Sequence, residues 1–441
     1  MSANASTAAP CAVPGTPLAE VRAGIDACVH CGFCLQACPT YLALDDENDS
    51  PRGRIVLMRS AYEGTLSLDD MSLRTHIDQC LGCRACETAC PSGVPYGQLL
   101  EATRATVAAK HRPPFVARMV LSVFRSPRLL SFTLWAARLI RQLGIADLLS
   151  ALPGRAGFSM AMLASTSRTF GGGRYEASSP SPTRGSATIL RGCVMDGLYR
   201  ETNRATERTL RLNGYAVHRA PPARCCGALH AHAGDLEGAR ELAKKSIEAF
   251  EATKSDYIVT NAAGCGAMMK EYGHLLANEP EWSERAERVA ARVRDVSELL
   301  AAAGPRRAGP MHLRVTYDAP CHLLHAQRVS AAPLQMLSAI ENLQFVPIAG
   351  ADKCCGSAGI YNLLEPAVSA QVLAPKLDEI RLSTADIVVT GNPGCLMQIG
   401  AGLYQGKTGT RAVHPVDLLD EAYATGIGAT QGSTPTRAPR R

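Results

Sequence analysis

Two nearly matching stretches decide how the first part of the chain folds: residues 28–39 read CVHCGFCLQACP, and residues 80–91 read CLGCRACETACP. Each stretch has four cysteines separated by two, two and three residues, and a proline directly follows the last cysteine. The repetition of so specific a pattern indicates that the eight thiols act together.

The spacing is that of bacterial two-cluster ferredoxins, in which the fourth cysteine of each run ligates the other cluster. Three closely spaced thiolates can surround one face of a cubane cluster, and the extra residue before the fourth cysteine carries that thiolate past it. We therefore predict two 4Fe-4S clusters. The expected ligands are Cys28, Cys31, Cys34 and Cys90 for the first cluster, and Cys80, Cys83, Cys86 and Cys38 for the second.

Structural zinc sites also use Cys-x-x-Cys pairs, so a zinc-binding sensor or scaffold protein is the alternative from another class. Zinc does not explain the third cysteine or the proline, and the pattern favours iron-sulfur clusters. Residues 51–64, PRGRIVLMRSAYEG, predict a helix that begins at the proline and indicate an α-helical ferredoxin domain. Arg52 and Arg54 then lie either near the clusters or at a solvated helix start.

The second part of the chain contains a duplication. Cys193, Cys225, Cys226 and Cys265 recur as Cys321, Cys354, Cys355 and Cys395, and both cysteine pairs are followed by glycine. Short β-branched runs precede the single cysteines, and amphipathic segments lie between them, which predicts α/β units with parallel sheets. The expected fold class is α+β multidomain: a helical ferredoxin domain followed by two repeated α/β cysteine-rich (CCG) domains.

Ligands of open parallel sheets gather at the carboxyl ends of the strands, where Cys193, Cys265, Cys321 and Cys395 fall. The eight cysteines are candidate ligands of a further metal or iron-sulfur site, with dithiol redox chemistry and simple packing as alternatives. Adjacent cysteines argue against packing, because neighbours on a strand point to opposite faces. Four histidines are candidate extra ligands or bystanders: His230, His232, His322 and His325.

Composition suggests where the domains begin and end. The two ends, residues 1–22 and 425–441, are rich in small and polar residues and are expected to be mobile tails. Between them we expect a ferredoxin-type domain at 23–112, a helical basic and apolar connection at 113–186, and cysteine-rich domains at 187–305 and 306–424. The Gly/Ser/Pro stretch at 171–186 marks the main boundary.

Charge and hydrophobicity limit the partners. The net charge of +6 over 441 residues is too small to favour nucleic acid. No signal-like segment opens the chain and no apolar run reaches the length of a membrane span, so a cytoplasmic protein is expected. Residues 102–146 contain eight Arg or Lys and no Asp or Glu, among Phe115, Met119, Phe124, Phe132, Trp135 and Leu139. This pattern is typical of peripheral contact with an anionic membrane, or of packing on the chain's own domains.

No flavin site is expected in this chain, because no Gly-x-Gly-x-x-Gly motif follows a predicted strand. Iron-sulfur clusters accept electrons singly, whereas oxidation of a 2-hydroxy acid removes two. The flavin, the substrate and the catalytic residues are therefore expected on a partner flavoprotein subunit.

The domain order and the sequence motifs resemble those of the iron-sulfur subunits of flavin-linked oxidoreductases, among them glycolate oxidase, anaerobic glycerol-3-phosphate dehydrogenase and heterodisulfide reductase. CVHCGFCLQACPTY, DSPRGRI, NAAGCGAMMKEYGHLL and GNPGCLMQIGAGL are most similar to the glycolate oxidase group, over roughly residues 20–424. The resemblance implies oxidation of glycolate to glyoxylate, with electrons passing from a flavoprotein partner to a membrane acceptor such as quinone at the inner membrane. A glycerol-3-phosphate or lactate dehydrogenase is the alternative.

One departure from these relatives concerns the end of each repeat. Heterodisulfide reductases end each half in Cys-x-x-Cys and can bind a non-cubane cluster with five thiolates, whereas here Met268 and Gln398 occupy the last positions. Five-thiolate ligation is therefore excluded. A site with four or fewer cysteines per half, one shared site and a vestigial site all remain open.

Overall fold

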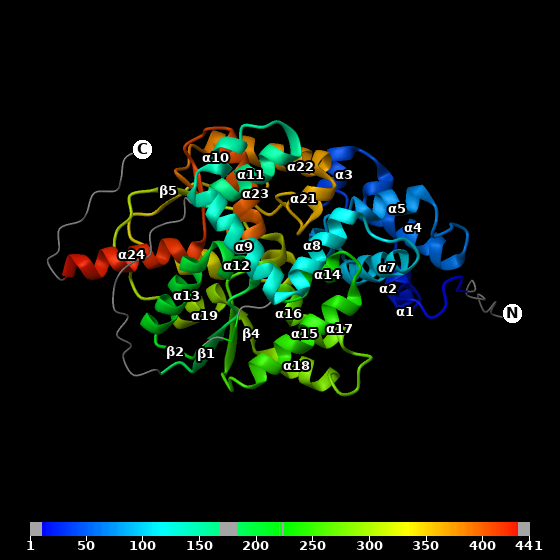
Figure 1. Cartoon of the computed structure of the whole chain (residues 1–441), viewed down its shortest axis with the longest axis horizontal. Coiled ribbons are helices and arrows are strands. Elements are labelled where there is room, and N and C mark those ends of the chain that lie inside the picture. The colour runs from blue at the N-terminus through cyan, green and yellow to red at the C-terminus, as the bar shows by residue number, and fades with distance from the viewer. Residues whose placement is uncertain (1–10, 167–182, 220, 223–224, 431–441) are drawn as a thin grey trace.

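The computed structural model describes residues 11–166, 183–219, 221–222 and 225–430. A helical N-terminal domain (blue in Figure 1) is followed by connecting helices (cyan) and by two α/β halves (green to red). Most of the predicted main boundary at 171–186 lies outside the described residues.

The N-terminal domain is helical, as predicted. Its elements are α1 (Pro17–Glu20), α2 (Arg22–Asp26), α3 (Pro39–Leu44), the 3₁₀ turn η1 (Glu47–Asp49), α4 (Pro51–Glu63), α5 (Met71–Asp78), α6 (Ala85–Ala89) and α7 (Tyr96–Lys110). Helix α4 begins at the expected proline, where Ser50 Oγ accepts a hydrogen bond from Gly53 N at 3.0 Å. It ends at Gly64, whose φ of 76° suits a glycine C-cap.

The predicted tail at residues 1–22 is wrong for the part that is described. Leu18 is fully buried, and its backbone N–H donates to Thr106 Oγ1 on α7 at 3.0 Å. Val13 belongs to the same core, and Ala12 N donates to Tyr62 O at 2.8 Å. Because these contacts bury apolar surface, residues 12–20 are part of the N-terminal domain.

The connection is made of α8 (Phe115–Arg125), α9 (Pro127–Gln142), α10 (Ile145–Leu149) and α11 (Gly154–Ser165). The inner side of α9 packs on the first α/β half, where Leu134 occupies the space that a Cβ at Gly197 would fill. Helix α11 packs closely on α23 of the second half. The connecting helices therefore touch both halves.

The first half contains β1 (Ser186–Ile189), α12 (Cys193–Leu198), α13 (Arg200–Leu212), β2 (Ala216–Val217), α14 (Ala228–His232), α15 (Leu236–Glu251), β3 (Tyr257–Thr260), α16 (Ala263–Lys270), α17 (Tyr272–Leu275), α18 (Ser283–Arg292), β4 (Val293–Asp295) and α19 (Val296–Ala303). The second contains β5 (Arg314–Tyr317), the π-helical turn η3 (His322–Ala326), α20 (Ala332–Leu337), β6 (Gln344–Phe345), α21 (Tyr361–Leu364), α22 (Pro366–Ser383), β7 (Ile387–Val389), α23 (Pro393–Gln405), β8 (Arg411–Val413) and α24 (Pro415–Thr430).

Each half holds one four-stranded parallel sheet, in the orders β2-β1-β3-β4 and β6-β5-β7-β8. The registers correspond: Ile189 pairs with Val259 in the first half, and Tyr317 pairs with Val389 in the second. Side chains from both sheets share one apolar core. The predicted pair of repeated parallel α/β units is confirmed.

The C-terminal end also differs from the prediction. Helix α24 continues to Thr430, and Ile427 packs against the core shared by the two sheets, so residues 425–430 are not a tail. Among the described residues, no helix is both long and apolar enough to cross a membrane.

Candidate iron-sulfur and thiol sites

The first cysteine-lined cavity of the N-terminal domain collects thiols from both sequence runs. Cys28, Cys31 and Cys34 come from the loop between α2 and α3, and Cys90 follows α6. Arg52 and Tyr96 also line this cavity. These four cysteines are the set that the sequence predicts for the first cluster.

The second cavity has the complementary composition. It is lined by Cys80, Cys83 and Cys86 together with Cys38, the residue before α3, and it is closed by Arg54 and Tyr96. Cys86 borders both cavities, so the two sites are neighbours. The structure thus brings together both predicted sets, with the fourth cysteine of each run beside the other run.

The turns that wrap the two runs have the same backbone conformation. His30 and Gly32 have φ values of 54° and 87°, and the corresponding Gly82 and Arg84 have 61° and 64°. Non-glycine residues in this region are uncommon and cost roughly 1 kcal/mol. Both runs carry this strain in the loops that aim the thiols, which is typical of a functional site.

The sequence left open whether Arg54 lies near the clusters or at a solvated helix start. In the structure it lies at the second cavity. Its side chain is fully buried, and Nη1 lies 4.0 Å from Cys38 Sγ and donates to Thr40 Oγ1 at 3.0 Å. Nη2 pairs with Asp49 Oδ1 at 2.9 Å. Tyr96 Oη donates to Cys80 Sγ at 3.6 Å, a contact that the sequence did not indicate. A guanidinium and a hydroxyl therefore face the sulfur atoms.

The spacing of the sulfur atoms bears on the zinc alternative. A tetrahedral site with Zn–S distances of about 2.3 Å holds its thiolates only about 3.8 Å apart. Among the described residues, no three cysteine Sγ atoms lie mutually within 4.8 Å; the only such group of metal-ligating side chains is Asp46, Asp49 and His76. The described thiols therefore do not form a preformed closed zinc site.

The repeated halves each gather four thiols in the same order. In the first half Cys193 contacts Cys225, Cys225 contacts Cys226, and Cys226 contacts Cys265. In the second half the same succession joins Cys321, Cys354, Cys355 and Cys395. Burial raises the pKa of Cys83 and Cys86, and thiol contacts together with burial raise the pKa of Cys193. Such thiols ionise only where a cation compensates.

One argument from the sequence is wrong: adjacent cysteines can both be buried. Cys225, Cys226, Cys354 and Cys355 are all at most 4% exposed. They lie in loops that lead to Gly227 and Gly356, not on strands, so strand alternation does not apply. Adjacency alone therefore does not exclude a packing role.

The four histidines are not part of the thiol series. His232 Nδ1 lies 3.0 Å from Glu101 Oε1, His322 Nε2 lies 3.1 Å from Gly82 O, and His325 Nδ1 lies 2.6 Å from Thr88 Oγ1. His230 is fully buried, and burial lowers its pKa. Three of the four join the repeats to the N-terminal domain.

The thiols of the second half adjoin the second cavity. Cys83 and Leu81 share an apolar cluster with Cys354 and Tyr361, and Tyr361 Oη donates to Gln79 O at 2.9 Å. The thiols of the first half lie instead under the connecting helices, where Cys193 and Cys225 pack with Leu130.

A buried ion pair distinguishes the second half. Lys376 Nζ donates to Asp318 Oδ1, and both side chains interact with Cys355 and Cys395. Although burial opposes its charged form, the Asp318 carboxylate raises the pKa of Lys376. No motif in the sequence indicated this pair. A residue-by-residue alignment of the repeats could have found it, because the two charged residues stand opposite Leu190 and Ser246 of the first half.

Comparison with known families agrees with this geometry. Residues 24–94 match the 4Fe-4S dicluster domain, and residues 187–270 and 315–400 each match the cysteine-rich (CCG) domain. The dicluster match covers the two crossed cysteine cavities, and the cysteine-rich matches cover the thiol series of the two halves. Both matches support iron-sulfur clusters in this chain.

Whole-chain relatives identify the group. The chain is 37% identical over 414 residues to the probable glycolate oxidase iron-sulfur subunit of Bacillus subtilis, covering 90% of this chain and 93% of the relative. It is 33% identical to the glycolate oxidase iron-sulfur subunit of Escherichia coli, covering 91% and 95%. Lactate utilization protein A of Geobacillus kaustophilus matches at 30% over 52% of this chain and 95% of the relative. The chain therefore belongs to the family of glycolate oxidase iron-sulfur subunits.

Proposed function

We propose that this chain is the electron-transfer subunit of a glycolate-oxidising complex, and that it passes electrons from a flavoprotein partner towards a membrane acceptor of the quinone class. The observation that carries the proposal is the pair of crossed cysteine cavities, in which each run supplies the fourth thiol of the other's site. Two 4Fe-4S clusters bound there would supply one-electron chemistry, which suits a relay between a two-electron flavin and an acceptor.

The proposed ligands are Cys28, Cys31, Cys34 and Cys90 for one cluster, and Cys38, Cys80, Cys83 and Cys86 for the other. Arg54 holds a permanent positive charge beside Cys38, and its pairing with Asp49 fixes its position. Tyr96 orients a hydroxyl toward Cys80. We infer that both groups stabilise negative charge at the second site and tune its potential.

Electron entry is assigned to the first cavity. Cys31 is exposed, whereas the other seven cysteines of the two runs are buried or half-buried. Val29 and Phe33 flank it and are each 68% exposed, although they are large apolar side chains. We infer that the flavoprotein partner docks over these residues, because aromatic and aliphatic side chains are favoured in interface cores.

The direction of the relay follows from the second cavity. Cys83 packs with Cys354, so the thiols of the second half are the next sulfur-rich site along the chain's interior. We infer that Cys321, Cys354, Cys355 and Cys395 hold a further metal or iron-sulfur group. Cys193, Cys225, Cys226 and Cys265 are the corresponding candidates in the first half.

Iron content tests the crossed assignment. The anaerobically purified chain should contain about eight iron and eight sulfide ions in its N-terminal domain. Cys38→Ser should remove chiefly the cluster held by Cys80, Cys83 and Cys86, as resolved by electron paramagnetic resonance. Cys11→Ser is the matched control, because Cys11 belongs to neither run. Selective loss of the Cys28 cluster would contradict the crossing, and stoichiometric zinc without iron would contradict the relay.

The substrate is tested with the partner present. The cluster-loaded chain alone should not oxidise glycolate with an artificial acceptor, and turnover should begin when the flavoprotein is added. Lactate and glycerol 3-phosphate in the same assay test the alternatives, of which the similarity to lactate utilization proteins favours lactate. Steady turnover without any flavin would overturn the relay role.

A further inference from the structure

The connecting helices carry a concentration of exposed apolar side chains. Nineteen large apolar side chains of the described residues are exposed, and eleven of them lie between residues 115 and 152. Phe115 is 71% exposed on α8, Phe132 is 64% and Trp135 52% exposed on α9, and Leu148 is 76% exposed on α10. So large an apolar surface on one helical segment marks an interaction site.

Helix α9 is apolar on two sides. Leu130 and Leu134 face the first half, beside Cys193 and Gly197. Leu129, Phe132, Trp135 and Leu139 follow one another at three or four residue steps and are exposed. The inner side already supplies the packing on the chain's own domain, so the outer row has no partner among the described residues.

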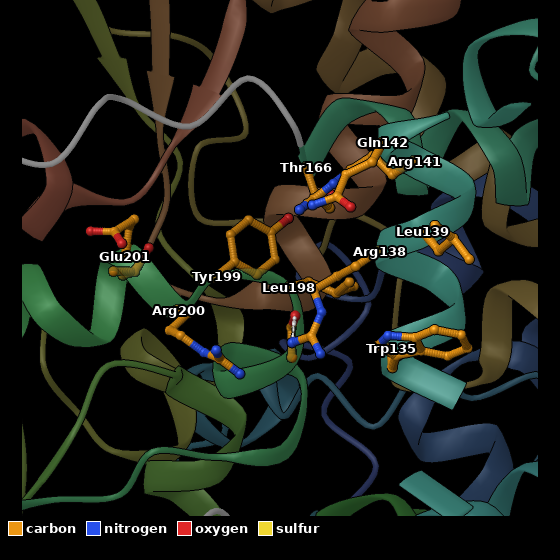
Figure 2. Close-up of a pocket in the computed structure, with 12 residues that line it drawn as sticks. Trp135, Arg138, Leu139, Arg141, Gln142, Thr166, Leu198, Tyr199, Arg200 and Glu201 are labelled. Carbon is orange, nitrogen blue, oxygen red and sulfur yellow. Dashed lines mark hydrogen bonds between the residues drawn. The ribbon is translucent and has the colours of Figure 1, made fainter. Parts of the chain in front are cut away.

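A cavity of about 690 Å³ opens beside this row, between α9 and the start of α13 (Figure 2). Arg138 and Arg141 line it from α9, where Arg141 Nη1 donates to Thr166 Oγ1 at 2.7 Å and Arg138 Nη1 donates to Gly197 O at 3.3 Å. Both acceptors are neutral. Neither guanidinium has a carboxylate partner in the described part of the chain.

Two further features of the cavity attract an anion. Tyr199 is only 4% exposed, its side chain points toward Arg141 in Figure 2, and no described residue hydrogen-bonds to its hydroxyl. Tyr199 is also the N-cap of α13, where no side chain caps the helix. A helix start with uncapped N–H groups carries partial positive charge, which adds to that of the two guanidinium groups. Glu201 in the first turn of α13 also lines the cavity, and its carboxylate is paired with Arg204.

We propose that the outer face of α8, α9 and α10 docks on a bilayer that contains acidic phospholipids, with a lipid phosphate bound between Arg138, Arg141 and the start of α13. Trp135 and Leu139 line the same cavity and belong to the exposed row, so one amphipathic ligand can meet both surfaces. Residues 102–146 have no acidic side chain, which matches an anionic membrane surface, and the acidic residue of α10, Asp147, accepts a hydrogen bond from Tyr404 Oη. The inference gives the proposed membrane acceptor a docking face.

The flavoprotein is the less favoured occupant of this face. The exposed Cys31 with Val29 and Phe33 lies between α2 and α3 of the N-terminal domain, a domain drawn to one side of α9 in Figure 1, and provides a separate apolar patch at the proposed electron entry. An acidic lipid explains the apolar row and the unpaired guanidinium groups together.

Vesicle binding tests the docking without any turnover. The full-length chain is mixed with vesicles of phosphatidylglycerol and phosphatidylcholine, or of phosphatidylcholine alone, and sedimented. We expect binding to the acidic vesicles that weakens with salt, and little binding to the neutral ones. The chain has two tryptophans, and Trp282 lies elsewhere, under Arg285 at 4.2 Å. A Trp282→Phe variant leaves Trp135 as the reporter, and its emission should shift to the blue on acidic vesicles.

Two pairs of variants test the two parts of the site. The double variant Arg138→Gln, Arg141→Gln should weaken vesicle binding about 25-fold, because each basic group near an anionic surface strengthens binding about fivefold. Phe132→Ser with Leu148→Ser should weaken it on the order of tenfold or more. Arg307→Gln and Leu382→Ser are matched controls, because these side chains are 82% and 76% exposed outside the face. Both controls should bind like the unchanged chain.

The outcomes separate the occupants and are independent of cluster chemistry. Absence of sedimentation with acidic vesicles at low salt would overturn the proposal, as would unchanged binding by both variant pairs. Displacement by millimolar inorganic phosphate would indicate a site for soluble anions instead. If the purified flavoprotein blocks vesicle binding and protects Trp135 from quenching, the face is the subunit interface.

Discussion

The two cysteine-rich halves share strand order, register and the succession of four thiols, but the side chains around those thiols differ. Gly227 and Gly356 have φ values of 94° and 83°, and a Cβ at either position would lie 3.0 Å or less from a backbone oxygen of α15 or α22, respectively. The backbone that shapes the thiol loop is therefore the same in both halves.

The environment of the thiols is apolar in one half and polar in the other. Leu190, Ala239 and Met268 belong to one apolar cluster of the first half. The equivalent residues of the second half are Asp318, Ser369 and Gln398, all of which are hydrogen-bonded. The comparison teaches that duplication kept the loop geometry while the electrostatics of the two sites diverged.

The largest expected effect comes from breaking the buried ion pair. Lys376→Met should lower the free energy of unfolding by about 3 to 5 kcal/mol, because it leaves the buried Asp318 carboxylate uncompensated. Chemical denaturation measures the change. Ser246→Ala, at the equivalent position, should cost about 1 kcal/mol, since it removes only uncharged hydrogen bonds, to Leu242 O and with the Tyr272 hydroxyl.

A double exchange sharpens this test. Asp318→Leu combined with Lys376→Ser gives the second half the residues of the first, and it should recover most of the loss. If the double variant is as unstable as Lys376→Met alone, the difference between the halves does not lie in this pair.

The two halves should respond to pH in opposite directions. Asp295 is the last residue of the edge strand β4 and His414 directly follows the equivalent edge strand β8, and both are at most 4% exposed. Burial raises the pKa of Asp295 to about 6 and lowers the pKa of His414 to about 4. The contribution of Asp295 to the free energy of unfolding is therefore lost as pH rises from about 4 through 6. The contribution of His414 is lost as pH falls from about 6.5 to 4.

Asparagine variants isolate the two groups. Relative to the unchanged chain, the free energy of unfolding of Asp295→Asn should rise by up to about 3 kcal/mol as pH rises through this window. That of His414→Asn should rise by a similar amount as pH falls. Urea unfolding from pH 4 to 7 measures both differences. Parallel stability curves for all three proteins would contradict the opposite roles.

The smallest effect concerns the last position of the repeated motif, which is Met268 in the first half and Gln398 in the second. Gln398 accepts a hydrogen bond from Asn362 Nδ2 at 2.9 Å and donates to Ser369 Oγ at 2.8 Å. Gln398→Met should cost about 1 to 3 kcal/mol, because it removes two buried hydrogen bonds. Met268→Gln should cost a similar amount by placing an amide in an apolar cluster. Thermal unfolding measures both, and a neutral Gln398→Met would show that the network is dispensable.

Local pattern made much of this molecule predictable. Cysteine spacing predicted both thiol sets because the wrapping loops span only a few residues, and the repeat predicted two parallel sheets ending at Cys193 and Cys321. Contacts between distant segments were not predictable, because no local pattern records them. Examples are the contacts of Leu18 with Thr106, of Cys83 with Cys354, and of Lys376 with Asp318. The first of these made the N-terminal tail prediction wrong.

The crossed cavities also set an order for biosynthesis. The run at residues 28–38 emerges from the ribosome well before the run at residues 80–90, yet neither cavity has four sulfur atoms until the later run is made. Clusters bound in these cavities would therefore be inserted only after the run at residues 80–90 has been made. A product that ends before Cys80 has the thiols of one run alone, so it completes neither of the crossed sites.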